Sequence, residues 1–90
     1  MKVIHPTKKF KKDLTNIIKS NRYKKQDLMD VIKLLANDKP LDVKYFDHAL
    51  TGNWIKHRCH IKPDWLLIYR FELDRLVLVR TGSHSRLLNK

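Results

Sequence analysis

The chain has 90 residues, which suffice for one small domain with a single hydrophobic core and leave no room for a second domain. It carries 20 Lys and Arg residues against 9 Asp and Glu residues, so its formal net charge at pH 7 is +11. This charge favours a polyanionic partner, and no apolar run approaches the ~20 residues that a membrane-spanning helix needs. The N-terminal segment also lacks the apolar centre of a secretory signal, so we expect a cytoplasmic protein without a membrane partner.

The cysteine and histidine pattern argues against a bound metal. Cys59 is the single cysteine, so the sequence offers neither an internal disulfide nor a Cys-x-x-Cys pair for zinc. The segments expected to be helical carry no His-x-x-x-His pair. We therefore expect Cys59 to be a small core residue in a reducing compartment, and we expect neither a metal nor a cofactor.

The first half of the chain predicts one short strand and two amphipathic helices. Residues 2–5 (KVIH) suit a strand, and Thr7 offers an N-cap for a helix that ends near Ser20. The apolar face of this helix consists of Phe10, Leu14, Ile17 and Ile18. A second helix follows a turn and ends before Pro40. Its apolar face consists of Leu28, Val31, Ile32 and Leu35.

The second half changes to the alternation of β-strands. Three runs rich in β-branched and aromatic residues, separated by short turns, predict strands over residues 54–61, 65–72 and 75–82. Turns of this length suit antiparallel neighbours. The expected fold is therefore a single α+β domain over residues 1–90, with two N-terminal helices packed on a small antiparallel sheet.

Alternation also divides these strands into two faces. The first run places Ile55, Cys59 and Ile61 on one side and Trp54, Lys56, Arg58 and His60 on the other. One side is typical of a core and the other is cationic. In the last run, Arg80 falls on the side of Leu76 and Leu78, where a charge needs a specific partner.

Titratable side chains are concentrated in this half. The group comprises His48, His57, His60, His84, Asp64, Arg58 and Arg80. A zinc site is one explanation, but the required ligand spacing is missing. A structural explanation is the second. In it, Asp64 caps the turn after Pro63 and pairs with Arg80, while His60 donates to a backbone carbonyl.

The third explanation is cleavage of RNA without a metal, in which a ribose 2′-OH attacks the adjacent phosphate. This reaction needs a base, cations that hold the charge developing on the phosphate oxygens, and an acid for the leaving 5′ oxygen. His60 and His84 supply the acid and the base, because imidazole titrates near neutral pH. Arg58 and Arg80 supply guanidinium groups for the phosphate. Trp65 offers a ring on which a base can stack, although an aromatic residue at a strand start is more often part of the core.

Three segments of this half resemble a known family. They are DHALTGNW at residues 47–54, RCHIKPDWLLIY at 58–69 and RTGSHS at 80–85. In this order and spacing they are similar to the YafQ branch of the RelE-type bacterial toxins, and the helical half agrees in pattern. The resemblance implies an α+β fold with helices against an antiparallel sheet. It also implies an endoribonuclease, an mRNA interferase that cuts mRNA in the ribosomal A site and so inhibits translation.

The resemblance further implies partners and site residues. The partners are mRNA and the ribosome, a cognate acidic antitoxin that holds the toxin inactive, and operator DNA only through the antitoxin complex. The implied catalytic residues are His48, His60, Asp64, Arg80 and His84. The implied RNA-binding residues are Lys56, Arg58, Trp65 and Leu88.

Roles within this set follow from the reaction. We expect His84 to be the acid and His60 the base, assisted by His48, with the reverse assignment open. Asp64 either accepts a proton or orients an imidazole. Leu88 stands where the family often has an aromatic residue, and a leucine cannot stack on a base, so we expect altered substrate positioning or codon preference.

A binding module is the alternative prediction. A basic RNA- or DNA-binding domain, or a regulator that binds an antitoxin, needs the same charge but no cleavage chemistry. For the antitoxin, we expect a disordered tail with acidic and apolar residues that folds across the sheet or the helices.

Overall fold

The structure is a computed structural model, and it describes residues 2–21, 23–41, 43–45, 48–50, 53–83 and 87. For residues 43, 48–50 and 53–56 it describes the backbone alone. The elements, in chain order, are β1 (Val3–Pro6), α1 (Lys8–Ser20), α2 (Lys25–Ala36), the 3₁₀ turn η1 (Val43–Tyr45), β2 (His48–Leu50), β3 (Asn53–Lys62), β4 (Trp65–Glu72) and β5 (Arg75–Ser83). The predicted short strand, two helices and three longer strands are therefore confirmed, and β2 is an addition that the sequence did not indicate.

The strands form one sheet in the order β1-β5-β4-β3-β2. As predicted, β3, β4 and β5 are antiparallel neighbours. The sheet as a whole is mixed, because β1 pairs in parallel with the first half of β5, from Val3 beside Arg75 to Pro6 beside Leu78. A parallel pair needs a long crossover. Here the chain between β1 and β5 contains both helices and the other strands. The pairing of β1 with β5 covers part of the sheet edge that β5 would otherwise expose.

Both helices begin and end where the sequence indicates. The Thr7 hydroxyl oxygen accepts a hydrogen bond from the Phe10 N–H at 3.1 Å, which caps the start of α1. Asn21 ends the helix in the left-handed conformation with φ of 59°. Phe10 and Ile17 are buried, whereas Ile18 is 46% exposed and lies outside the apolar face that the sequence assigned to it.

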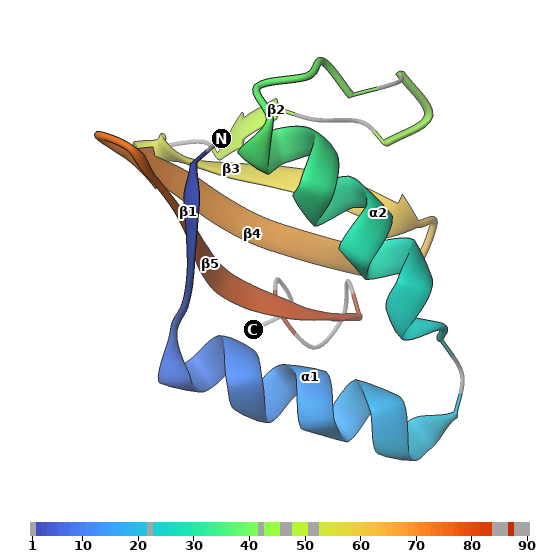
Figure 1. The fold of residues 1–90 in the computed structure, drawn as a ribbon. Coiled ribbons are helices and arrows are strands. Elements are labelled where there is room, and N and C mark those ends of the chain that lie inside the picture. The colour runs from blue at the N-terminus through green and yellow to red at the C-terminus, as the bar shows by residue number, and fades with distance from the viewer. Residues whose placement is uncertain are drawn as a thin grey trace.

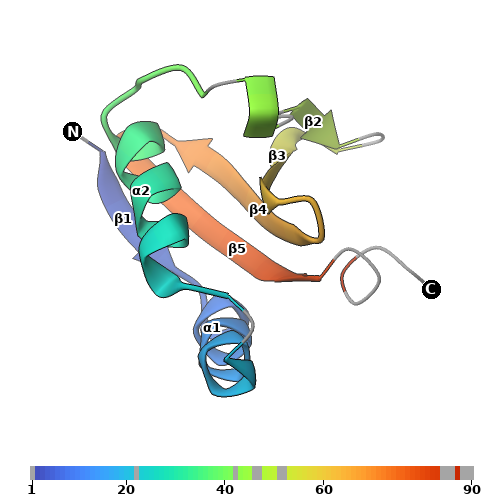
Figure 2. The ribbon, with the colours of Figure 1, turned by 90° about the vertical axis from the view of Figure 1, so that its right-hand side faces the viewer.

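The helices occupy different places on the sheet (Figures 1 and 2). α2 crosses one face of the sheet, whereas α1 runs along β5 beyond the stretch that β1 covers. Two side chains attach α1 to this edge. The Thr7 hydroxyl donates to the Val79 carbonyl at 2.9 Å, and the Thr81 N–H donates to the Asp13 carboxylate at 3.2 Å. These bonds satisfy backbone groups of β5 that have no neighbouring strand there.

The core lies between the helices and the sheet face that α2 covers. Its sheet residues are Cys59 and Ile61 on β3, Trp65, Leu67 and Tyr69 on β4, and Leu76 and Leu78 on β5. Its helical residues include the buried face predicted for α2. Cys59 is fully buried, which confirms its expected place in the core.

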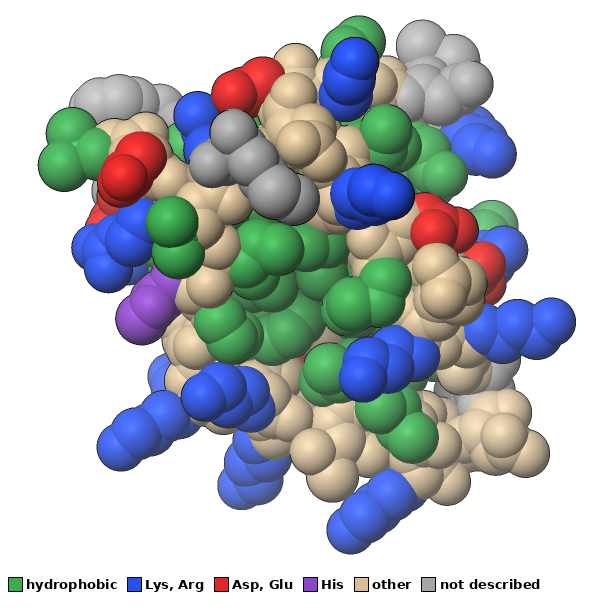
Figure 3. Space-filling model, in the orientation of Figure 1, with side chains coloured by type: hydrophobic (Ala, Val, Ile, Leu, Met, Phe, Trp, Pro, Cys, Tyr) green, Lys and Arg blue, Asp and Glu red, His purple; other side chains and the backbone are tan. Residues whose placement is uncertain are grey.

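The surface combines charge with an apolar patch. Figure 3 shows Lys and Arg side chains around the rim of this view and hydrophobic side chains gathered between β1, α1 and α2. Within the described residues, no helix is long and apolar enough to cross a membrane.

Candidate active site

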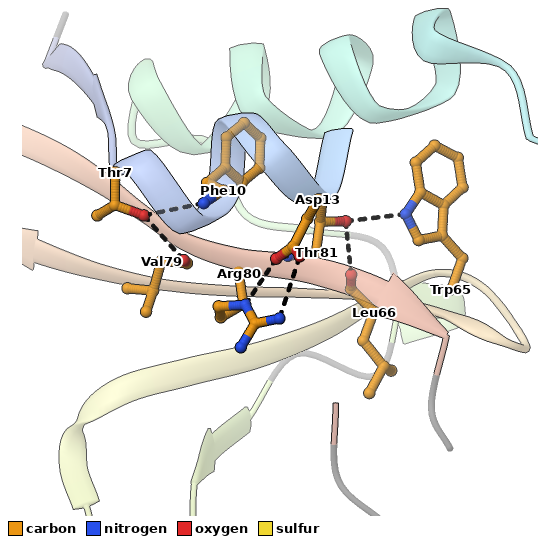
Figure 4. A network of polar contacts seen from close by, with 8 residues as sticks. All are labelled: Thr7, Phe10, Asp13, Trp65, Leu66, Val79, Arg80 and Thr81. Atoms are coloured by element: carbon orange, nitrogen blue, oxygen red, sulfur yellow. Dashed lines mark hydrogen bonds and ion pairs between the residues drawn. The ribbon is translucent and has the colours of Figure 1, made fainter. Parts of the chain in front are cut away.

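A bulge in β5 decides where Arg80 points. Arg80 pairs with Ile68 of β4, but Leu78 pairs with the next residue, Tyr69, so Val79 is an extra residue between two registered pairs. In a regular strand, Arg80 would share a side with Leu78. The inserted residue turns Arg80 to the opposite face, so the expectation that it lies beside the core leucines is wrong. Figure 4 shows Arg80 and Leu66 directed to one side of the sheet and Trp65 to the other.

We call the sheet surface opposite α2 the far face, defined by Arg58, His60, Leu66, Ile68 and Arg80. Across the strands, Arg58 pairs with Ile68, and Ile68 pairs with Arg80. Directly paired residues project to the same side, so Arg58 and Arg80 lie on either side of Ile68 on this face. In the next row, His60 pairs with Leu66. The structure therefore brings together three of the predicted site residues on one face.

Asp13 of α1 is the partner of Arg80. The Arg80 Nε donates to Asp13 Oδ2 at 2.6 Å and its Nη2 donates to Oδ1 at 3.0 Å. This hydrogen bonding raises the pKa of Arg80 above its ordinary value, against the opposing effect of burial. The structural explanation that paired Arg80 with Asp64 is therefore wrong.

Asp64 lies at the exposed turn between β3 and β4, where its carboxylate accepts a hydrogen bond from the Tyr23 hydroxyl at 3.2 Å. The next residue, Trp65, pairs with Ser83 at the end of β5. The β3–β4 turn and the end of β5 therefore meet at one end of the sheet. His84 follows Ser83 directly in the chain, and it lies outside the described residues.

Trp65 is a core residue. Its ring is fully buried, stacks on Tyr23 with 4.7 Å between ring centroids, and donates from Nε1 to the Thr81 hydroxyl at 2.8 Å. A base can stack only on a ring with an exposed face. The prediction that Trp65 stacks on RNA is therefore wrong for this structure, and the aromatic residue at a strand start is part of the core.

The remaining predicted positions are placed in part. Arg58 and His60 are half-buried. His48 pairs with Arg58 through the backbone of β2, and Lys56 lies on β3, but both side chains are outside the described set. Leu88 also lies outside the described residues, so its predicted role stays a prediction.

Sequence reasoning missed Asp13, although a signal was available. Asp13 occupies the i+3 position of the stripe that begins at Phe10 and continues through Leu14 and Ile17. A carboxylate on the stripe that faces the core requires a partner when it is buried. The structure supplies that partner from β5, far away in the sequence.

The α+β fold and the arginine and histidine residues of the far face define a class of protein, and sequence comparison identifies that class. The sequence model of the family described as "Bacterial toxin of type II toxin-antitoxin system, YafQ" matches residues 2–89. The chain therefore belongs to this family of bacterial toxins. Membership confirms the resemblance that the three sequence segments indicated.

Particular relatives agree with this assignment. The Escherichia coli K12 protein named "mRNA interferase toxin YafQ" is 44% identical over 55 residues, and the match spans 60% of that relative's length. The solved structure of a metal-bound toxin from Helicobacter pylori is 43% identical, with a TM-score of 0.90 over 98% of this chain and 100% of that chain. The structure of the E. coli DinJ-YafQ toxin-antitoxin complex is 31% identical, with a TM-score of 0.84 over 97% of each chain.

A metal was not predicted for this chain. In the part of the chain that the structure describes, no three His, Cys, Asp or Glu side chains lie close enough to share a metal ion.

Proposed function

We propose that this chain is the toxin of a type II toxin-antitoxin system and that it is an endoribonuclease acting on mRNA. The observation that carries the proposal is the pair of arginines on the far face, Arg58 and Arg80, which flank Ile68 with His60 in the adjacent row. Guanidinium groups hold phosphate oxygens in two-point contacts, and imidazole transfers protons near neutral pH. The related E. coli protein is named an mRNA interferase, which supports the same activity.

The proposed mechanism is an intramolecular transfer at phosphorus without a metal. His60 takes the proton of a ribose 2′-OH, whose oxygen attacks the adjacent phosphate. Arg58 and Arg80 stabilise the negative charge that develops on the non-bridging oxygens. The bond from phosphorus to the 5′ oxygen breaks, and His84 protonates that oxygen. The products are a cyclic 2′,3′-phosphate and a free 5′-hydroxyl end.

The remaining site residues have supporting roles in this proposal. His48 assists the base from the strand beside Arg58. Asp64 orients an imidazole or accepts a proton at the end of the sheet, and Lys56 and Arg58 bind the RNA backbone. Leu88 packs against the substrate without stacking.

The proposed partners follow from charge and from a relative. A formal charge of +11 suits both the ribosome with its mRNA and an acidic antitoxin. The related E. coli toxin has been solved in complex with its antitoxin DinJ. We propose that an antitoxin likewise inhibits this chain, that operator DNA is bound only through that complex, and that the toxin acts in the cytoplasm.

Incubation with programmed ribosomes, followed by mapping of mRNA ends, tests this function. We expect new 5′-hydroxyl ends within the translated frame, and no such ends after addition of the acidic protein encoded beside the toxin. Slow cleavage of free RNA should persist in a chelator selective for transition metals. Bound but intact mRNA would favour the alternative of a binding module, and activity restored only by added zinc would contradict a metal-free mechanism.

His84→Ala tests the proposed acid. Because a general acid contributes roughly 10²- to 10⁴-fold, we expect the single-turnover cleavage rate to fall by that factor while the melting temperature is unchanged. His5→Ala is the matched control, since His5 is an exposed histidine on β1 and should leave the rate unchanged. A folded His84→Ala protein that cuts at the parent rate would exclude His84 from the mechanism.

A further inference from the structure

Asp13 is a carboxylate that the mechanism above does not use. It is 7% exposed and is therefore one of the few polar side chains buried with the core. Its two oxygens accept three hydrogen bonds, from Arg80 Nε, Arg80 Nη2 and the Thr81 N–H. A carboxylate that is buried to this extent requires hydrogen-bond donors and an opposite charge as partners. The bonds connect α1 with the strand that carries the proposed phosphate-binding arginine.

The geometry of the ion pair leaves one edge of the guanidinium available. Asp13 occupies the edge formed by Nε and Nη2. Asp13 does not contact Nη1, and Nη2 carries a second hydrogen that points away from the Nε edge. The edge formed by Nη1 and Nη2 matches two phosphate oxygens. Arg80 can therefore hold a phosphate while Asp13 continues to hold Arg80.

The surroundings give an anion access to this pair. A recess of about 240 Å³ beside it is lined by Lys9, Lys12, Asp13, Asn16 and Arg80. The side chain of Arg80 is 35% exposed, whereas that of Asp13 is 7% exposed. The carboxylate is thus withdrawn and the guanidinium faces solvent.

An unrestrained arginine samples many rotamers, and ordering it during substrate binding costs free energy. Asp13 is itself anchored twice, by its place on α1 and by the backbone of Thr81, so it restrains the guanidinium before substrate arrives. The same carboxylate lowers the net charge of the site by one. Asp13 therefore weakens the electrostatic attraction of the site for RNA, but it gives the Arg80 guanidinium a defined orientation.

We propose that Asp13 is a positioning residue for RNA cleavage, which orients the Arg80 guanidinium so that its Nη1 and Nη2 edge faces the scissile phosphate. This inference rests on the proposed endoribonuclease function. In a purely structural role, Asp13 would only close the edge of β5. The positioning role instead predicts that loss of Asp13 lowers the cleavage rate without weakening RNA binding.

Asp13→Asn is the decisive variant. An asparagine oxygen in the place of Oδ2 can still accept from the Thr81 N–H and from Arg80 Nε, but the amide nitrogen in the place of Oδ1 cannot accept from Arg80 Nη2. We expect single-turnover cleavage on programmed ribosomes to fall at least about tenfold, because small misplacements of a positioned group cost up to about 100-fold. We expect the dissociation constant for the same ribosomes to be unchanged or smaller, because one negative charge is removed.

Glu72→Gln is the matched control. Glu72 also accepts from two arginine groups, at 2.6 Å from Arg70 Nε and 3.0 Å from Arg75 Nη2, but at the β4–β5 turn. Hydrogen bonding to Arg70 lowers the pKa of Glu72 below its ordinary value of 4.5, so this substitution also removes one charge at neutral pH. Its cleavage rate should equal that of the parent protein.

Coupling between the two residues provides a second arm. If Asp13 acts through Arg80, then Asp13→Asn should cause no further loss of rate in an Arg80→Ala background. Equal fold-losses in both backgrounds would overturn the inference. An Asp13→Asn protein that cuts at the parent rate, or that loses rate only because it binds ribosomes more weakly, would overturn it as well.

The inference stays testable if Asp13→Asn does not fold. In the parent protein, the Nε–H resonance of Arg80 should exchange slowly with water, and it should remain slow when a non-cleavable oligonucleotide is bound. Arg75 is the reference, because it binds the Glu72 carboxylate through Nη2, whereas Arg80 binds Asp13 through Nε as well. Equal exchange rates for the two resonances would overturn the inference. A parent protein that leaves all mRNA intact would overturn the proposed function and this inference with it.

Discussion

Thr81 joins the core to the candidate site through three hydrogen bonds. Its hydroxyl accepts from Trp65 Nε1 at 2.8 Å and donates to the Leu66 carbonyl at 2.8 Å, while its N–H donates to Asp13. The residue is 1% exposed, so water cannot replace these partners. A single hydroxyl thus fixes the indole ring and stands next to the proposed phosphate-binding arginine.

Thr81→Val should therefore destabilise the protein. The substitution keeps the shape of the side chain but leaves the buried Trp65 N–H and one carbonyl without this partner, which costs about 1–3 kcal/mol. Urea unfolding measures the change in the free energy of unfolding. Thr15→Val is the matched control, because the Thr15 hydroxyl donates to the Lys11 carbonyl on the exposed surface of α1. Equal losses for both variants would show that the Thr81 hydroxyl bonds are not stabilising.

At the level of elements, the bulge in β5 changes which residues of this strand face the core. Before Val79, the strand places Leu76 and Leu78 in the core. After it, Arg80 lies on the far face, while Thr81 is again buried on the core side beside Trp65. α1 stabilises this arrangement because Thr7 bonds to the carbonyl of the extra residue. The helix and the bulge together determine where the cation projects.

Deletion of Val79 tests this role of the bulge. Without the extra residue, Leu78 still pairs with Tyr69 and Arg80 with Ile68, so regular alternation keeps Arg80 on the far face. We expect cleavage to persist and the free energy of unfolding to fall by about 1 kcal/mol, because the Thr7 hydroxyl loses the Val79 carbonyl. Val79→Ala keeps both the residue count and this carbonyl and should leave cleavage and stability unchanged. A deletion variant that folds but no longer cuts RNA would show that the bulge itself, and not only the face of Arg80, is needed for cleavage.

At the level of the whole molecule, the charge is widely spread but its sites are not equivalent. The chain has 20 basic and 9 acidic residues. Many lysines are simply solvated, which keeps a small protein soluble. Lys9 and Lys12 differ from the others because they line the recess that contains Arg80. They are therefore the lysines that we expect to contact RNA phosphates near the site of cleavage.

Salt dependence distinguishes these lysines from the rest. Each contact between a basic side chain and a phosphate of single-stranded RNA contributes about 0.7 to the slope of log affinity for that RNA against log salt concentration. Replacing both Lys9 and Lys12 by Ala should reduce the magnitude of the slope by about 1.4. Lys33 and Lys39, which border a different recess beside α2, provide the matched double replacement and should leave the slope unchanged. Equal effects of the two pairs would indicate a diffuse contact surface.

The sequence by itself determined the family, both α-helices and the strands other than β2. The 3.6-residue period and the Thr7 cap specify α1, and the alternation with short turns specifies β3, β4 and β5. These signals are local, because helix caps, turn residues and apolar periodicity act over a few positions. The three segments between residues 47 and 85 were specific enough to indicate a family that the whole-chain match confirms.

Only the tertiary structure decided which residues meet. Arg80 has its partner 67 positions away, and its face depends on a one-residue register shift that no local pattern encodes. Trp65 is buried because Tyr23, from the connection between α1 and α2, stacks on it and Thr81 of β5 bonds to it. In each case the outcome depends on packing between segments distant in sequence. Alternation predicts which face of the sheet each side chain occupies in a regular strand. A bulge and a packed helix determine which face it actually occupies.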